Sequence, residues 1–417
     1  MKILLYGINF SPELTGIGKY TGELAAWLAS RGHEVSVVTA PPYYPEWQVH
    51  DGYKAGRYRK EIWKGVTVYR VPLWVPKRPS GLKRILHLAS FAATSLPVAW
   101  WRLAHRPDAV LVVEPPLFCA PATLLGAAVV GSRSWLHVQD FEVDAAFDLG
   151  MLSGKTLRKA VLGVERFLMR RFTRVSTISS KMRERLLAKG VEPDRVVLFP
   201  NGVDLDAVKP LDRPSVIRAE LGIPEHAVVA LYSGNMGGKQ GLEILGEVAH
   251  LLAAQPDIRF VFCGEGPTKP VLQAACRDLP NVHFLPLQPI ERLSELLGAA
   301  DIHLLPQRKD AADLVMPSKL TGILASGKPL ICASPEGTEL ANVVANCGVL
   351  TPPEDAAAMA DALLKLAQDP ARRTVLGAAG RTYARNWLDA ETIFRRFEEA
   401  LLQTLPDPRE PQHQSKP

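Results

Sequence analysis

The sequence predicts an α/β protein with two doubly wound, parallel-sheet domains, and three observations lead to this prediction. The chain has 417 residues, enough for two or three domains of average size. Short β-branched runs alternate with amphipathic stretches, which is typical of parallel strands joined by crossover helices. Proline and glycine cluster between residues 200 and 224, where one such series ends and the next begins.

The β-branched runs predict strands in both halves of the chain. In the first half they are Lys2–Ile8, Glu34–Thr39, Val66–Val71, Ala109–Val113, Ser134–Val138, Arg174–Thr177 and Arg195–Phe199. In the second half they are Val228–Tyr232, Arg259–Cys263, Val282–Leu285, Ile302–Leu305 and Pro329–Cys332.

From this order we expect an N-terminal domain over residues 1–205 and a C-terminal domain over residues 206–385. A helix within residues 386–405 is expected to cross back to the N-terminal domain. Residues 406–417 are rich in Pro and Gln, so we expect an unstructured tail there.

Composition excludes several classes of protein. Hydrophobic residues make up 47% and charged residues 22% of the chain, which excludes a disordered, collagen-like or coiled-coil protein. The five cysteines have neither CxxC nor zinc-site spacing, so we expect a reducing, cytoplasmic location and no metal. The N-terminal apolar run is too short for a signal peptide and is interpreted as the first strand.

Charge is distributed unevenly between the two halves. Residues 1–200 hold 28 Lys and Arg against 16 Asp and Glu, whereas residues 201–417 hold 21 against 27. Twelve basic residues and the single acid Glu61 lie between Lys54 and Arg106, interleaved with aromatic side chains. The apolar run Ile85–Trp101 contains Pro97 and is too short to span a membrane, and Lys155–Arg174 is a basic amphipathic stretch.

Two interpretations of these basic stretches are open. They are either ordinary core helices with solvated basic faces or a surface that binds anionic lipid. Taken together they favour peripheral attachment to an anionic membrane surface, at the inner face of the plasma membrane. Nucleic acid is not expected as a partner, because no nucleic-acid-binding signature is present.

Glycine-rich loops after predicted strands form the first group of candidate site residues. Gly16 and Gly18 precede the expected helix Lys19–Ser30, where backbone N–H groups and the helix N-terminus suit a phosphate. The P-loop and dinucleotide-binding patterns both fail at this loop, and a plain tight turn is the alternative. In the second half, Gly234, Asn235 and Lys239 form a similar loop that suits a diphosphate.

Further candidates follow other predicted strands. The turn Gly264, Glu265 and Gly266 suits a planar base, and Asp313, Ser318 and Lys319 precede an expected helix. His137 ends a predicted strand, and Asp140, three residues later, is a catalytic candidate that would orient the imidazole or hold a hydroxyl, although a lone histidine is more often structural. Because open parallel sheets bind ligands at the carboxyl ends of their strands, these loops together predict a phosphorylated ligand between the domains.

The motifs, in their order along the chain, resemble the retaining glycosyltransferases of family 4, which have the GT-B fold. The resemblance covers about residues 1–400 and rests on Gly16-Ile-Gly18, His137-x-x-Asp140, Pro200-Asn-Gly-Val-Asp204, Gly234-x4-Lys239-x-Gly241, Gly264-x-Gly266-Pro and Ala325-Ser-Gly327-Lys-Pro329. It implies two Rossmann-like domains that face each other across a cleft. The runs 6–20, 40–45, 232–235 and 314–320 resemble a subgroup of fucosyltransferases of colanic acid biosynthesis.

The resemblance implies a site and a reaction. The C-terminal domain is expected to hold a nucleotide diphosphate sugar, GDP-fucose by the subgroup, with Lys239 and Lys319 on the diphosphate and Gly264–Gly266 near the base. The N-terminal domain is expected to hold a polyprenyl-diphosphate-linked saccharide as acceptor, which fits its basic, apolar surface. His137 corresponds to the family's active-site histidine. The departing phosphate oxygen takes the acceptor's proton, and neither a metal nor a cofactor is expected.

The chain departs from the family pattern at three positions. Asn235 stands where the family usually has an arginine, and Leu314 and Gly322 stand where it has two glutamates. Asp313 is the nearest carboxylate that could replace one of them.

Three alternatives therefore stay open: a UDP-sugar-dependent glycosyltransferase of the same fold, a nucleotide-sugar 2-epimerase, and a non-catalytic nucleotide-sugar-binding component of an assembly complex. The failed dinucleotide fingerprint disfavours a nicotinamide dehydrogenase.

Overall fold

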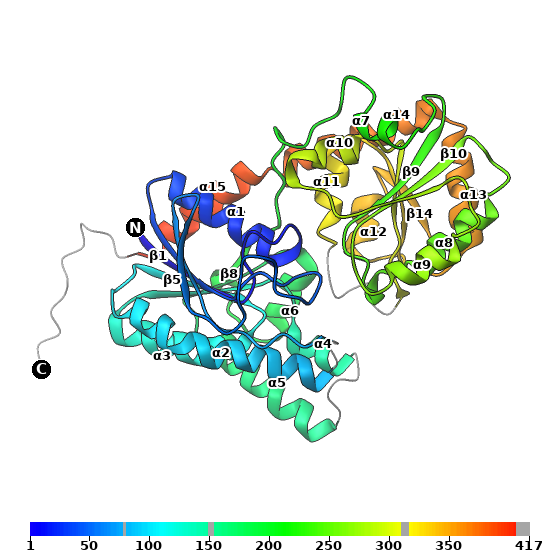
Figure 1. Cartoon of the computed structure of the whole chain (residues 1–417). Coiled ribbons are helices and arrows are strands. Elements are labelled where there is room, and N and C mark those ends of the chain that lie inside the picture. Colours follow the sequence, from blue (N-terminus) through cyan, green and yellow to red (C-terminus); the bar gives the residue numbers. More distant parts are fainter. Residues whose placement is uncertain (78–80, 149–153, 310–316, 406–417) are drawn as a thin grey trace, which may run out of the picture.

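The computed structural model describes residues 1–77, 81–148, 154–309 and 317–405, and these form two α/β domains side by side (Figure 1). Each domain has its own sheet, covered by helices on both faces. Two doubly wound domains are the fold class that the sequence predicts, and this prediction is confirmed.

The N-terminal domain contains an eight-stranded sheet in the order β3-β4-β2-β1-β5-β6-β7-β8. The strands are β1 (Lys2–Tyr6), β2 (Glu34–Thr39), β3 (Arg59–Trp63), β4 (Val66–Arg70), β5 (Ala109–Glu114), β6 (Arg133–Val138), β7 (Arg174–Thr177) and β8 (Val196–Leu198). All neighbours are parallel except β3 and β4, which form an antiparallel hairpin at the edge. The sequence analysis missed β3, because its charged, largely exposed side chains lack the apolar run of a buried strand.

The C-terminal domain contains a six-stranded parallel sheet in the order β11-β10-β9-β12-β13-β14. The strands are β9 (Val228–Ser233), β10 (Ile258–Cys263), β11 (Val282–Leu285), β12 (Ile302–Leu305), β13 (Leu330–Ala333) and β14 (Gly348–Thr351). The four-residue edge strand β14 begins at a glycine and was also missed. The order reverses direction at β9 and β12, and open sheets bind ligands beside such a reversal.

The helices of the N-terminal domain are α1 (Gly16–Ser30), α2 (Gly81–Leu103), α3 (Ala120–Val130), α4 (Glu142–Asp148), α5 (Lys155–Met169) and α6 (Ser180–Ala188). Those of the C-terminal domain are α7 (Val216–Glu220), α8 (Glu243–Leu251), α9 (Lys269–Ala275), α10 (Leu293–Gly298), α11 (Lys319–Ala325), α12 (Glu339–Val344), α13 (Ala356–Ala367) and α14 (Pro370–Trp387). No helix in the described ranges is both long enough and apolar enough to cross a membrane.

The last helix, α15 (Ala390–Leu402), packs on the N-terminal domain although it follows the C-terminal domain in the chain (Figure 1). Its Phe397 ring stacks on Phe199, with ring centroids 4.6 Å apart, and also contacts Trp135. The two segments that connect the domains pair with each other, because Val203 N–H donates to Leu388 O (2.8 Å) and Ala390 N–H donates to Val203 O (3.1 Å). The domains are therefore joined by two adjacent segments of chain.

Candidate active site

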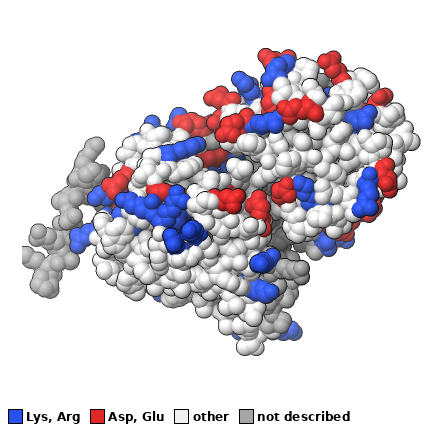
Figure 2. Space-filling view, in the orientation of Figure 1, with Lys and Arg blue, Asp and Glu red and all other residues white. Residues whose placement is uncertain are grey.

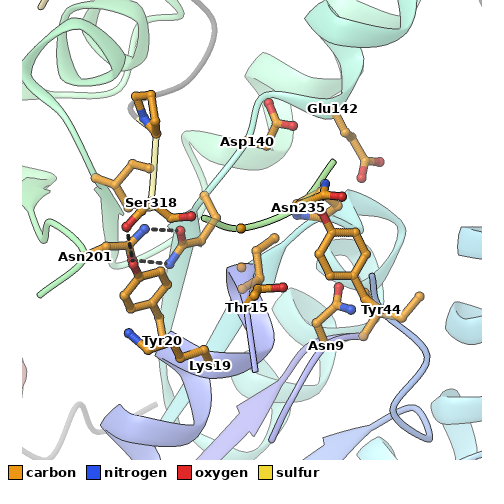
Figure 3. A pocket seen from close by; sticks show the side chains of 18 of the residues that line it. Asn9, Thr15, Lys19, Tyr20, Tyr44, Asp140, Glu142, Asn201, Asn235 and Ser318 are labelled. Atoms are coloured by element: carbon orange, nitrogen blue, oxygen red, sulfur yellow. Dashed lines mark hydrogen bonds between the residues drawn. The ribbon is translucent and has the colours of Figure 1, made fainter. Parts of the chain in front are cut away.

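A cavity of about 780 Å³ lies between the two domains, at the carboxyl ends of both sheets. The N-terminal domain lines it with residues that follow β1, β5, β6 and β8 and with side chains of α1, α2 and α5. The C-terminal domain lines it with the loop after β9 and the N-terminus of α11. Figure 3 shows these side chains converging on one space from both domains.

The two glycines of the first loop have different roles. Gly16 lines the cavity and begins α1 with a φ of 65°, a backbone conformation that favours glycine. Gly18 is buried, and a Cβ there would lie 2.2 Å from an oxygen of the buried Glu13. Glu13 in turn accepts the N–H groups of Tyr43 and Tyr44, both at 3.1 Å. The structure therefore assigns Gly18 to loop packing and leaves Gly16 as the glycine at the cavity.

His137 does not line the cavity. Its side chain is 3% exposed and lies against Phe199, with ring centroids 4.9 Å apart. Nε2 accepts a hydrogen bond from the amide nitrogen of Gln139 (2.9 Å), so the ring proton resides on Nδ1, which donates to Ser176 Oγ (2.9 Å). Burial lowers the pKa of His137 to about 3, so the imidazole is neutral.

This geometry differs from the prediction of a catalytic histidine. Two residues further along the chain, Gln139 lines the cavity instead of His137. Successive side chains of a strand alternate between faces, so His137 and Gln139 share a face, and only the residue beyond the strand's end reaches the cleft. Gln139 pairs with Asn201, which also lines the cavity. The sequence analysis included neither amide among its site residues.

Two acidic side chains lie beside this pair. Asp140 and Glu142 both line the cavity, and Figure 3 shows them close together on one side of it. Glu142 accepts the backbone N–H of Leu117 (3.3 Å) through one oxygen, and burial raises the pKa of its carboxyl to about 7. Asp140 is thus at the cavity, as the sequence predicts, and its catalytic role stays a prediction.

Lys319 is the most distinctive polar group on the C-terminal side. Its Nζ donates to Tyr232 OH (2.6 Å) and to Gln240 Oε1 (3.0 Å), and it lies 4.1 Å from the centroid of the Tyr232 ring. Burial lowers the pKa of its ammonium group to about 7. No carboxylate is among these hydrogen-bond partners of Lys319, and an anionic ligand would supply the missing negative charge.

The loop after β9 connects the two sides of the cleft. Asn235, which replaces the family's arginine, donates from its amide to Tyr44 OH of the N-terminal domain (2.9 Å). Tyr20 OH donates to the backbone oxygen of Ser318 at the start of α11 (3.0 Å). Gly234 also lines the cavity, and its φ of 126° is again one that favours glycine. Gly234, Asn235, Ser318 and Lys319 therefore lie together, as the sequence predicts.

The turn Gly264–Gly266 is not among the residues that line the cavity, and its place near the base stays a prediction. A Cβ at Gly264 would lie 1.9 Å from Gly234 O, and one at Gly266 would lie 2.4 Å from Met236 O. Both glycines let the loops after β9 and β10 pack closely, and Glu265 forms an ion pair with Lys269 (2.7 Å). Cys263, Leu287 and Gln288 line the cavity next to this turn.

Three positions from the sequence analysis are described only in part or not at all. Asp313 and Leu314 lie outside the described residues, as does the Lys239 side chain, whose backbone belongs to the 3₁₀ turn Gly238–Gln240. Gly322 lines the cavity on α11, and a Cβ there would lie 3.1 Å from Leu297 Cδ1. A larger residue at this position would require Leu297 Cδ1 to shift by a few tenths of an ångström.

The described parts of the chain contain no group of three or more His, Cys, Asp or Glu side chains that could hold a metal ion. All five cysteines are buried and free, and burial raises the pKa of Cys263, which lines the cavity, to about 12.

Solved structures of the same architecture define the class of protein. Sucrose-phosphate synthase of Thermosynechococcus elongatus superposes with a TM-score of 0.75 at 18% identity, covering 97% of this chain and 98% of that one. Anabaena HepE, solved in complex with UDP and glucose, superposes with a TM-score of 0.70 at 17% identity, covering 97% and 100%. These likenesses show the fold of GT-B glycosyltransferases.

Sequence comparisons show the family. Residues 15–202 match the family model described as glycosyl transferase 4-like domain, and residues 215–383 match glycosyl transferases group 1. WcaI of Escherichia coli K12, named as a colanic acid biosynthesis glycosyl transferase, is 43% identical over 407 residues, covering 95% of this chain and 98% of WcaI. D-inositol 3-phosphate glycosyltransferase 1 of Catenulispora acidiphila is 27% identical, covering 91% and 89%. The chain belongs to glycosyltransferase family 4, as its motifs indicate.

Proposed function

We propose that this glycosyltransferase transfers a sugar, with retention of anomeric configuration, from a nucleotide diphosphate sugar to a lipid-linked saccharide in exopolysaccharide biosynthesis. GDP-fucose is the favoured donor, because the runs 6–20, 40–45, 232–235 and 314–320 resemble fucosyltransferases. The name of the relative WcaI, which refers to colanic acid biosynthesis, supports the pathway. The proposed acceptor is a polyprenyl-diphosphate-linked saccharide.

The observation that carries this proposal is the desolvated ammonium group of Lys319 in the interdomain cavity. Among the described residues, its Nζ donates to neutral oxygens of Tyr232 and Gln240, and these oxygens do not balance its charge. A diphosphate would provide that compensation through charge-assisted hydrogen bonds. Because phosphate leaves with a developing negative charge, the same contact would stabilise the transition state of sugar transfer.

The N-terminal surface supports a lipid-linked acceptor. α2 exposes Leu82, Leu86, Trp100 and Trp101, and its neighbour α3 exposes Leu125 and Val129. Figure 2 shows a largely uncharged surface over α2 and α3, with Lys and Arg side chains near its borders. An apolar surface bordered by cations suits peripheral binding to anionic lipid, where a polyprenyl chain would be anchored.

The first experiment is thermal unfolding of the protein with GDP, UDP, ADP, dTDP and NAD. A ligand present at about 100 times its dissociation constant stabilises the folded state by about 2.7 kcal/mol, a shift of several degrees. A shift of the unfolding temperature with GDP alone supports GDP-fucose as the donor. A shift with UDP alone is consistent with a glycosyltransferase but excludes GDP-fucose as its donor. A shift with NAD alone, or with none of the five, contradicts the proposal.

Turnover is then measured with the nucleotide sugar and polyprenyl-linked saccharides, and NMR of the product reports the anomeric configuration. We expect Lys239→Ala to reduce kcat by about 10²–10³-fold, the usual cost of removing a positioned charge from a transition state. An activity within threefold of the wild type would exclude Lys239 from the mechanism. We expect full activity in EDTA, and dependence on magnesium would contradict a metal-independent reaction.

A further inference from the structure

Several carboxyl groups of the N-terminal domain lie close together on one side of the cavity. Asp140, Glu142 and Glu165 line the cavity, and Figure 3 shows the first two. All members of the group are near enough to influence one another's ionisation. The group consists of Glu114 at the end of β5, Asp140 before α4, Glu142 and Asp144 in α4, and Glu165 in α5.

The nearby cations form no ion pair with Glu142 in the part of the chain that the structure describes. Lys189, which follows α6, is buried, and its Nζ forms ion pairs with Asp144 (2.8 Å) and with Glu165. Arg84 of α2 lines the cavity and acts on Glu142 through its electric field. The positive charge of Lys189 is thus shared by two other carboxylates, and Glu142 is left without a cation in direct contact.

Several oxygens of the group have no hydrogen-bond donor among the described residues. Glu142 accepts the backbone N–H of Leu117 through Oε1 (3.3 Å), and its Oε2 has no partner. Glu165 is fully buried and pairs with Lys189 through Oε2, and its Oε1 has no partner. Glu114 is also fully buried, and neither of its oxygens has one. Buried oxygens of this kind need a hydrogen, which either a bound proton or a donor group of a ligand supplies.

These surroundings bring the ionisation of Glu142 close to neutral pH. Burial raises the pKa of its carboxyl to about 7, where the negative charges of Asp140 and Glu165 act in the same direction and the positive charge of Arg84 opposes them. Burial also raises the pKa of Glu114 well above its usual range, so Glu114 holds its proton. Glu142 can therefore take up and release a proton at the cavity under physiological conditions.

Sugar transfer needs a group that takes a proton, because the acceptor hydroxyl loses its hydrogen when its oxygen bonds to the sugar. Glu142 lines the cavity on the side of the N-terminal domain, where we propose that the acceptor binds. His137, the histidine expected in the site from the sequence, does not line this cavity. A general base works best when its pKa is near the operating pH and contributes about 10²–10⁴-fold in rate.

We propose that Glu142 is the general base of sugar transfer, and that its carboxylate accepts the proton of the acceptor hydroxyl as that oxygen bonds to the anomeric carbon. In the same reaction the bond between the anomeric carbon and the phosphate oxygen breaks, and its electron pair stays on the departing nucleotide diphosphate. The proton then passes from Glu142 to water. This inference rests on the proposed function, and it gives the proton a destination other than the phosphate oxygen that the family resemblance implies.

The test measures kcat/KM for a polyprenyl-diphosphate-linked saccharide from about pH 5.5 to about pH 8.5. The nucleotide sugar, GDP-fucose or UDP-glucose, is saturating, which keeps the titration of Lys319 in the free enzyme out of the measurement. In the wild type kcat/KM should rise about tenfold per pH unit below pH 7 and level off above it, because only the ionised carboxylate accepts a proton. Glu142→Gln should lower the plateau about 10²-fold and abolish the rise.

Variants of the neighbouring charges provide a readout that a merely structural role of Glu142 would not move. Asp140→Asn removes a negative charge and lowers the pKa of Glu142, so it should shift the rise to lower pH. Arg84→Met removes a positive charge and should shift the rise to higher pH. Glu184→Gln changes an exposed carboxylate of α6 and, as the control, should leave rate and profile unchanged.

A Glu142→Gln variant with the rate and pH profile of the wild type would overturn the inference, leave the proposed function intact and favour the departing phosphate as proton acceptor. A rise that Asp140→Asn abolishes and Glu142→Gln retains would overturn it in favour of Asp140. If Glu142→Gln does not fold, a rise that stays in place in both Asp140→Asn and Arg84→Met would overturn it.

Calorimetry with GDP and UDP separates a catalytic loss from damage to the site. We expect Glu142→Gln to bind the nucleotide as the wild type does. A loss of nucleotide affinity as large as the loss of rate would overturn the inference, because it would indicate general damage. If the wild type transfers no sugar from either donor, the proposed function fails, and the inference fails with it.

Discussion

At the scale of single residues, burial controls the charge state of the side chains around the cleft. Lys319 is half-buried in the wall of the cavity and His137 is buried, and in both cases desolvation lowers the pKa because it penalises the charged form. The consequences differ, because Lys319 lines the cavity and His137 does not. A ligand can restore the charge of Lys319, whereas His137 stays neutral in the folded protein.

For Lys319 we predict proton uptake when a nucleotide diphosphate binds. With a pKa of about 7 the free side chain is mostly neutral at pH 8, and an adjacent diphosphate raises the pKa so that the side chain takes up a proton. Affinity should therefore fall as the pH rises above 7. Calorimetry in buffers of different ionisation enthalpy measures the uptake, and it should vanish in Lys319→Met. Uptake that persists in this variant would assign the proton to another group.

A second prediction at this scale concerns stability at acidic pH. His303 is fully buried in the C-terminal core, and burial lowers its pKa to about 3, compared with about 6.5 in an unfolded chain. Between these values only the unfolded chain binds the proton, so the free energy of unfolding falls as the pH decreases below about 6.5. The contribution of His303 to this fall should be about 2 kcal/mol between pH 7.5 and pH 5.

Urea unfolding at the two pH values measures this loss of stability. In His303→Leu the decrease in the free energy of unfolding between the two pH values should be smaller by about 2 kcal/mol. The stability of this variant at pH 7.5 should also be lower than that of the wild type. The neighbouring buried Leu304 provides the control, because Leu304→Ala lowers the stability but removes no titratable group and should leave the pH dependence of the wild type unchanged. A fall of equal size in His303→Leu would show that other groups cause the acid sensitivity.

At the scale of elements, the helices of the N-terminal domain separate into buried and exposed faces. α5 buries Leu168 and Met169, whereas Val164 and Phe167 on the same helix are exposed. Lys155, Arg158, Lys159 and Arg166 are exposed on the same helix, so α5 presents apolar and positive groups together to solvent. This arrangement fits a membrane surface that includes α5 together with the exposed apolar side chains of α2 and α3.

We predict that the protein binds vesicles with anionic lipid at low salt and dissociates at high salt. Each basic residue near such a surface contributes about 1 kcal/mol, so reversing Lys155, Lys159 and Arg166 of α5 to Glu should abolish binding in a vesicle sedimentation assay. Reversal of three exposed basic residues of the C-terminal domain, Arg277, Lys365 and Arg372, is the control and should preserve binding. Equal losses in both triple variants would contradict a surface specific to α5.

At the scale of the whole molecule, direct contacts hold the two domains together across the cavity. The carboxylate of Glu339 at the start of α12 accepts the backbone N–H groups of Ser180 (2.8 Å) and Lys181 (2.9 Å) at the start of α6. Unpaired N–H groups and the helix dipole make a helix N-terminus a favourable partner for a carboxylate. Tyr20 with Ser318 and Asn235 with Tyr44 form further contacts between the domains.

We predict that Glu339→Ala widens the cleft, because the carboxylate contact is lost while the two connecting segments remain. Small-angle X-ray scattering of the ligand-free protein should then show a larger radius of gyration than in the wild type. Glu336→Ala removes a nearby exposed carboxylate that makes no such contact and should not change the radius. An unchanged radius in Glu339→Ala would show that the remaining contacts suffice to keep the cleft closed.

The site residues were predictable where the local sequence alone determines whether a residue lies at the cleft. Gly16, Gly234 and Lys319 follow strands or begin helices, and these positions place them at the carboxyl edge of a parallel sheet. The roles of Gly18 and Gly264 were not predictable in this way. Both make room for another segment of the molecule, Glu13 and Gly234 respectively, and sequence does not show which segments come together.

The class of fold, the positions of most strands and the glycosyltransferase family follow from the amino-acid sequence alone, because hydrophobic periodicity and loop motifs are local properties of the chain. That Gln139 and Asn201 line the large interdomain cavity, whereas His137 does not, depends on how distant parts of the chain pack together. His137 is covered where Phe199 and the returning helix α15 pack on the sheet. That packing joins residues about 60 and 260 positions apart, so its effect on the site arises only in the folded molecule.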